Sequence, residues 1–98
     1  MKLINLIEIR KDNKLNQTKI AKYLYMSLTK YHSIETGKIP MPASDLIKLS
    51  YLFNIRSEFI LGVFRKRIPL TKEERNEIKK YLDKINFKPN LYLQQKNL

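Results

Sequence analysis

The stretch from residue 16 to residue 38 constrains the fold more than any other, because it reads as two short helices joined by a tight turn. The first helix is expected at 17–24, with Asn16 as its N-cap and apolar residues at helical spacing. A short interruption follows, after which Ser27 is placed to cap a second helix at 28–36. The pattern therefore predicts a compact pair of helices rather than one long helix.

The second helix of this pair has one apolar side and one polar side. At about 100° per residue, Tyr31 and Ile34 fall together and are expected to be buried. The opposite side, flanked by Leu28 and Lys30, carries short polar side chains: Thr29, His32, Ser33 and Thr36. Such a face suits contact with base edges and phosphates, although a solvated helix face is the alternative. The stretch between residues 13 and 44 holds five lysines and a single acid, Glu35, which favours the nucleic-acid interpretation.

A wider set of positions follows the same register over residues 3–62: Leu15, Asn16, Gln17, Ile20, Ala21, Ser27, Tyr31, Ile34, Glu35, Gly37, Lys38, Leu46, Ile47, Lys48, Leu49, Phe53, Asn54, Ile55, Leu61 and Gly62. With this spacing the chain resembles the lambda-repressor-like, or Xre-type (Cro), helix-turn-helix family. The resemblance implies an all-α, five-helix domain that binds double-stranded DNA, with the helix at 28–36 in the major groove. It also implies a transcriptional regulator, expected to be a repressor that acts as a homodimer on an operator.

The same resemblance assigns roles to individual residues. It implies that six residues read bases: Ser27, Leu28, Thr29, Lys30, His32 and Ser33. It implies that four more meet phosphates: Asn16, Gln17, Thr36 and Lys38. None of the six base-facing residues is Gln, Asn or Arg, the types best suited to bidentate readout, so these residue types specify no particular operator.

One departure from the family lies in the turn, where Tyr25 stands at a position that is usually glycine. If this position has a positive φ, the bulky side chain costs about 1 kcal/mol. Either the turn differs locally, or Tyr25 gains something by packing.

A charged residue interrupts the apolar stripe of the first helix, which is expected at 2–13. Leu3, Leu6 and Ile7 form the stripe, and Arg10 occupies its next position. An arginine there either snorkels to solvent or pairs with an acid inside the domain. The resemblance implies the second alternative, a structural ion pair between Arg10 and Glu35.

Two more helices complete the first 62 residues. Gly37 is expected to end the helix at 28–36, and a fourth helix is expected from Ala43 or Ser44 to Phe53. A short fifth helix follows, for which Ser57 is the expected cap, and residues 59–61 are expected to close the core.

The composition changes at residue 63, so residues 63–98 are expected to form a second part: a basic linker, an amphipathic helix and a C-terminal arm. Thr71 and Glu74 form a capping-box pattern that opens a sixth helix running to residue 86. Its apolar stripe consists of Ile78, Tyr81, Leu82 and Ile85.

A single amphipathic helix must dock on its own domain or on a second copy. We expect residues 70–98 to form the homodimer contact, because the five-helix unit already closes on residues 59–61 and leaves nothing to cover the stripe of the sixth helix. The last residues, 87–98, are expected to be a mobile arm or a segment ordered only by a partner chain. The alternative is an antitoxin-like protein, in which this segment binds a partner protein while residues 1–62 regulate their own operon.

The formal net charge of +11 in 98 residues favours a polyanionic partner. The chain has no cysteine and a single histidine, His32, so no metal site, cofactor or catalytic centre is expected. No apolar run reaches the length of a membrane span. We therefore expect a cytoplasmic protein that is not an enzyme and does not enter a membrane.

Overall fold

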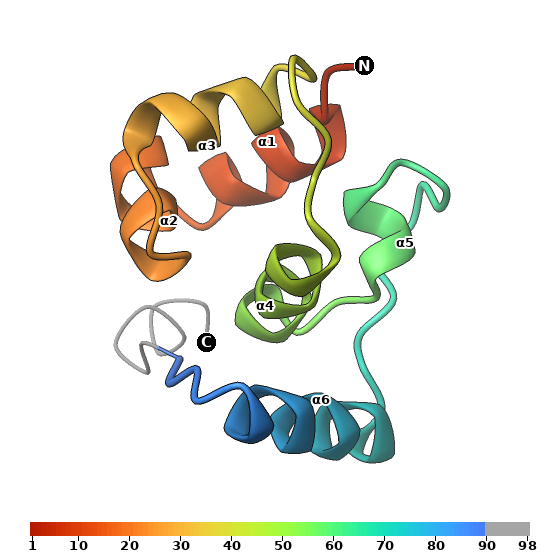
Figure 1. Ribbon diagram of the computed structural model, residues 1–98. Coiled ribbons are helices and arrows are strands. Elements are labelled where there is room, and N and C mark those ends of the chain that lie inside the picture. The colour runs from red at the N-terminus through yellow and green to blue at the C-terminus, as the bar shows by residue number, and fades with distance from the viewer. Residues whose placement is uncertain (90–98) are drawn as a thin grey trace.

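The computed structural model describes residues 1–89, and within them the chain is all-α, with six helices and no extended strand (Figure 1). The helices run as follows: α1 Ile4–Asp12, α2 Gln17–Tyr23, α3 Leu28–Glu35, α4 Ala43–Phe53, α5 Ser57–Ile60 and α6 Lys72–Lys84. The all-α class is thereby confirmed. The helix ends lie within two residues of those expected from the sequence.

Side-chain caps set three of the six helix starts. The Asn16 side-chain oxygen accepts from the Lys19 backbone N–H at 2.8 Å, and Ser27 Oγ accepts from the backbone N–H of Lys30 at 3.1 Å. Thr71 and Glu74 form the reciprocal capping box at the start of α6. These three predictions are confirmed.

The predicted cap of α5 was wrong. Ser57 is already the first helical residue, and Arg56 holds the N-cap position without a side-chain cap bond. The reason is a contact with the segment before α6. The Arg56 backbone N–H donates to the carbonyl of Ile68 at 2.9 Å, and this bond holds residue 56 extended.

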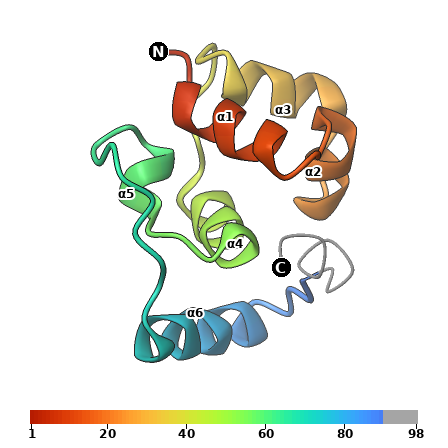
Figure 2. The ribbon, with the colours of Figure 1, turned by 180° about the vertical axis from the view of Figure 1, so that it is seen from behind.

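Helices α1 and α3 lie side by side, α2 packs on α3, and α4 lies between this group and α6 (Figures 1 and 2). The chain before α1 is tied to the end of α3, since the Leu3 backbone N–H donates to the Glu35 carbonyl at 2.9 Å. Gly37 follows with a φ of 82°, and a Cβ atom there would lie 2.2 Å from the Met1 carbonyl oxygen. Glycine is therefore required on both conformational and steric grounds.

The core confirms the buried side predicted for α3, because Tyr31 and Ile34 are both buried. Phe59 and Ile60 also close the core as expected. Leu61 does not: its side chain is 43% exposed. Helix α5 has only one turn and ends at Ile60, so Leu61 lies at the C-cap, where the chain turns away through Gly62 with a φ of 82°.

Helix α6 folds back on its own domain. Leu82, at 1% exposure, and Phe87, at 5%, belong to the same apolar cluster as Leu49 and Tyr31. Ile78 and Tyr81 pack against that cluster, whereas Ile85 is 41% exposed. The premise that the α6 stripe has nothing to cover it was therefore wrong, because residues 1–62 leave an apolar side of α4 that α6 completes.

Polar contacts fix α6 on α4. The Arg75 guanidinium lies 3.9 Å from the centre of the Tyr51 ring and donates to the Tyr51 carbonyl at 3.0 Å. Arg56 joins the start of α6 through an ion pair with Glu74 at 2.8 Å. The expectation that the arm begins at Phe87 was also wrong, because this residue is buried. Residues 90–98 of the predicted arm lie outside the described residues.

Candidate nucleic-acid interface

The exposed side of α3 and its cap carries all six residues predicted to read bases. Ser27, Leu28, Thr29, Lys30 and His32 are exposed, and Ser33 is half-buried. This follows from helical geometry, since Tyr31 and Ile34 fix the opposite side of α3 in the core. Leu28 is 47% exposed, which places an apolar group at the start of an otherwise polar face.

The charge around this face is positive. Five lysines, all exposed, lie on α2, on α3 and in the flanking loops: Lys14, Lys19, Lys22, Lys30 and Lys38. None of them takes part in an ion pair within residues 1–89. The single acid of this region, Glu35, is buried at 2% exposure. The surface between residues 13 and 44 therefore presents no exposed carboxylate.

Beneath this face lies the predicted ion pair between α1 and α3. Arg10 Nη2 lies 2.8 Å from Glu35 Oε1, and Arg10 Nε donates to Oε2 at 2.9 Å, so the pair is bidentate. Arg10 Nη1 also donates to the Leu15 carbonyl at 3.0 Å. Arg10 is only 7% exposed, so it does not snorkel to solvent. The prediction of a buried structural pair is confirmed.

The surroundings of the Glu35 carboxylate stabilise its charged form. Burial by itself would raise the pKa of Glu35, but the hydrogen bonds from Arg10 and Gln17 outweigh it and hold the pKa below its ordinary value. The Tyr31 hydroxyl lies beside this group without a hydrogen bond of ordinary geometry to any atom of residues 1–89, and burial raises its pKa.

Gln17 connects the buried pair to the exposed face. Its Nε2 donates to Glu35 Oε1 at 2.9 Å, and its Oε1 lies 3.4 Å from Nδ1 of His32. The first residue of α2 is therefore engaged inside the protein as well as being half-exposed. The sequence placed Gln17 at the interface but gave no sign of its bond to Glu35, because that contact depends on how α2 packs on α3.

The other residues predicted to meet phosphates differ in what they offer. The Asn16 side-chain oxygen is used in capping α2, and Thr36 Oγ1 donates to the His32 carbonyl at 2.8 Å. Lys38 is exposed, while its backbone N–H donates to the Ser33 carbonyl at 2.8 Å. Of the four predicted residues, Lys38 is thus the one that brings a charged group to the surface.

The turn between α2 and α3 resolves the question posed by Tyr25. Its φ is 56°, so the turn keeps the left-handed geometry despite the bulky residue. The Tyr25 ring is 76% exposed on the whole but meets the edge of Phe87, with ring centres 5.8 Å apart. Packing on Phe87 is the alternative that the structure bears out. The contact with Phe87 was not predicted, because Phe87 is far from the turn along the chain and was expected to belong to the arm.

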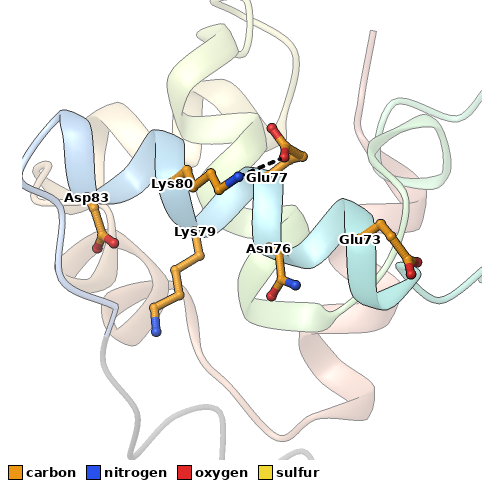
Figure 3. Close-up of a pocket in the computed structure, with 6 residues that line it drawn as sticks. All are labelled: Glu73, Asn76, Glu77, Lys79, Lys80 and Asp83. Atoms are coloured by element: carbon orange, nitrogen blue, oxygen red, sulfur yellow. Dashed lines mark hydrogen bonds and ion pairs between the residues drawn. The ribbon is translucent and has the colours of Figure 1, made fainter.

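The surface hollow on α6 lacks the features of a ligand site. It measures about 370 Å³ and lies on the outer side of α6, and Figure 3 shows its lining side chains projecting from that one helix, with an ion pair between Lys80 and Glu77. Ligand sites are usually enclosed and mainly apolar, which this hollow is not. In the described part of the chain, no group of three or more His, Asp or Glu side chains is placed to hold a metal ion. Nor does any helix of residues 1–89 combine the length and apolarity needed to span a bilayer.

No protein-family model, curated protein or solved structure matches this chain. Its own geometry is therefore what bears on function: an exposed polar helix face, five exposed lysines around it and a buried ion pair beneath. This face is positively charged and is not an enclosed apolar cavity of the kind that usually binds a small ligand.

Proposed function

We propose that this chain is a sequence-specific, double-stranded DNA-binding transcriptional regulator, a repressor, that inserts α3 into the major groove. The observation that carries the proposal is the exposed polar face of α3 within a surface where lysines are exposed and the nearby acid is buried. The major groove admits an α-helix, and phosphates on both sides of it attract lysines.

The lambda-repressor-like helix-turn-helix arrangement is part of the proposal. It is supported by α2, a connection at residues 24–27 and α3, capped at both starts. In that arrangement the first helix crosses the DNA backbone and the second enters the groove. Lys19 and Lys22 on α2 would then meet phosphates, and the residues at the start of α3 would meet bases.

The proposed base contacts follow from the side-chain chemistry. The hydroxyls of Thr29 and Ser33 can donate to or accept from base edges, and Leu28 can contact a thymine methyl group. The contact of His32 with Gln17 gives its ring a preferred orientation through a residue that is itself bonded to Glu35. The buried pair thereby supports the exposed face.

We further propose that two copies bind one operator. Two half-sites about 34 Å apart match a two-fold dimer carrying two copies of α3. The α6 stripe does not support this step as first expected, because Leu82 is buried within its own domain.

Selection of bound duplexes from a random pool, at a stated salt concentration, tests the proposal. Enrichment of one sequence with two inverted half-sites supports it. Recovery of a pool without any enriched sequence would remove sequence-specific binding.

Two substitutions separate base contacts from phosphate contacts. Lys38→Ala should weaken binding to all duplexes about equally, whereas Thr29→Ala should change which selected sequence binds best. Lys79→Ala is the matched control, since it removes an exposed lysine from the outer side of α6. Binding assays with the selected and scrambled duplexes give the comparison, and an equal effect of Thr29→Ala on both duplexes would contradict the base-reading role.

A further inference from the structure

We propose that Phe87 is a positioning residue: it holds the turn between α2 and α3, so that the end of the α6 segment controls how α3 is presented to DNA. The effect on DNA rests on the proposed function, whereas the hold on the turn can be tested without DNA.

The Phe87 ring is enclosed by groups from other elements. Its centre lies 5.3 Å from that of Tyr23 and 5.8 Å from that of Tyr25, with interplanar angles of 84° and 86°. Nζ of Lys48, from α4, lies 4.7 Å from the Phe87 ring centre. Edge-to-face ring pairs and a cation over a ring face are both favourable arrangements. Phe87 therefore bridges the end of α2, the turn and α4.

The turn between α2 and α3 needs this stabilising contact because of its backbone conformation. Tyr25 has a φ of 56°, which is strained for a bulky residue. The hydrogen bond from its backbone N–H to the Lys22 carbonyl, at 3.1 Å, closes the turn. The Met26 N–H donates to the Ala21 carbonyl at 3.0 Å, and Ser27 then caps α3. Tyr25 precedes Leu28, the first residue of α3, by only three residues, so a change in the backbone at Tyr25 is passed on to the start of α3.

The backbone of Phe87 is held by the end of α6. The Phe87 backbone N–H donates to the Leu82 carbonyl at 2.9 Å, and Asn86 turns the chain with a φ of 58°. Leu82 is buried in the core. The docking of α6 therefore determines where the Phe87 ring lies, and the turn depends on a residue that the α2–α3 pair does not itself supply.

A double-mutant cycle tests this coupling. The proteins are the full chain, Tyr25→Gly, Phe87→Ala and the double variant, and amide hydrogen exchange at residues 25 and 26 is the readout. Phe87→Ala should speed this exchange about tenfold, the upper range for loss of an aromatic pair. In the Tyr25→Gly background, Phe87→Ala should change the exchange rate by about twofold at most, because glycine adopts a positive φ without support. Phe87→Leu, which keeps apolar bulk, should give an intermediate result and serves if the alanine variant does not fold.

Ile78→Ala is the matched control, because it removes a partly buried α6 side chain that packs against the same apolar cluster but precedes Phe87 by nine residues. It should leave exchange in the turn and affinity for duplex DNA unchanged, whereas Phe87→Ala should weaken affinity by about the same tenfold factor. Equal exchange in Phe87→Ala and the unchanged protein, or equal effects of Phe87→Ala in both Tyr25 backgrounds, would overturn the inference. Failure of the unchanged protein to bind any duplex would instead overturn the proposed function, and the exchange cycle would still decide the hold on the turn.

Discussion

Arg10 and Glu35 are buried together, and each is tolerated in the interior because of the other. The bidentate contact and the added bond from Gln17 satisfy the Glu35 carboxylate, and the Leu15 carbonyl satisfies a further donor of Arg10. Removing one partner of such a pair leaves an uncompensated buried charge. These residues therefore join α1 to α3 firmly and keep negative charge away from the exposed face of α3.

Glu35→Gln should lower the free energy of unfolding at neutral pH by about 3 kcal/mol, because it leaves the Arg10 charge buried without a counter-ion. Chemical denaturation measures the change. Glu77→Gln is the matched control, since its ion pair with Lys80 is almost fully solvated and pairs of this kind contribute little.

The same substitution should alter the response to acid. The pKa of Glu35 in the folded protein is lowered from an ordinary value of 4.5, so its stabilising effect is complete above that value and is lost as the pH falls through the folded pKa. The unchanged protein should therefore lose stability below about pH 4.5 more steeply than Glu35→Gln. Parallel pH curves, or a loss below about 0.5 kcal/mol at neutral pH, would show that the pair does not stabilise the fold.

Helix α6 completes the core rather than extending from it. It packs on α4 through Leu82 and is held there by Arg75 and by the pair between Arg56 and Glu74. Residues 1–62 and 63–98 differ in composition, but Leu82 and Phe87 belong to the cluster formed by the first five helices.

The stripe on α6 offers a matched pair of substitutions. Leu82→Ala should lower the free energy of unfolding by about 2–5 kcal/mol, the usual cost of emptying a buried leucine site. Ile85→Ala should cost far less, because that side chain is 41% exposed. Denaturation at low and high protein concentration gives the difference between the two variants. A difference that appears only at high concentration would mean that Leu82 is buried by a second copy.

Helix positions were largely predictable because their signals are local. Asn16, Ser27 and the pair of Thr71 and Glu74 act within one turn of helix, and the structure confirms each of them. The docking of α6 was not predictable in the same way, because an amphipathic stripe indicates that a face is buried without indicating its partner.

In the candidate site, too, local features were predictable from the sequence and contacts between distant segments were not. The exposed face of α3 followed from helical periodicity, and the pair of Arg10 and Glu35 followed from the family resemblance. The bond between Gln17 and Glu35 and the contact of Phe87 with Tyr25 did not, because both depend on packing between helices that are separate in the sequence.

Positive charge is the dominant property of the protein, with a formal net charge of +11. Several carboxylates are already matched: Glu35 pairs with Arg10, Asp45 with Lys48, and Arg67 with both Glu8 and Asp12. The lysines around α2 and α3 have no such partners within residues 1–89, so this surface keeps an unneutralised positive charge, as the proposed binding to DNA requires.

The salt dependence of binding to duplex DNA tests whether the exposed lysines around α3 meet phosphates. If six phosphates are neutralised, a plot of log K against log salt should have a slope of about −5, because each neutralised phosphate releases a condensed counter-ion. Lys22→Ala should make the slope shallower by about one per lost contact, while Lys79→Ala, on the outer side of α6, should leave it unchanged. A slope near −5 that becomes shallower in Lys22→Ala and stays the same in Lys79→Ala is the predicted result. A flat salt response, or no binding to duplex DNA at low salt, would contradict DNA binding through this surface.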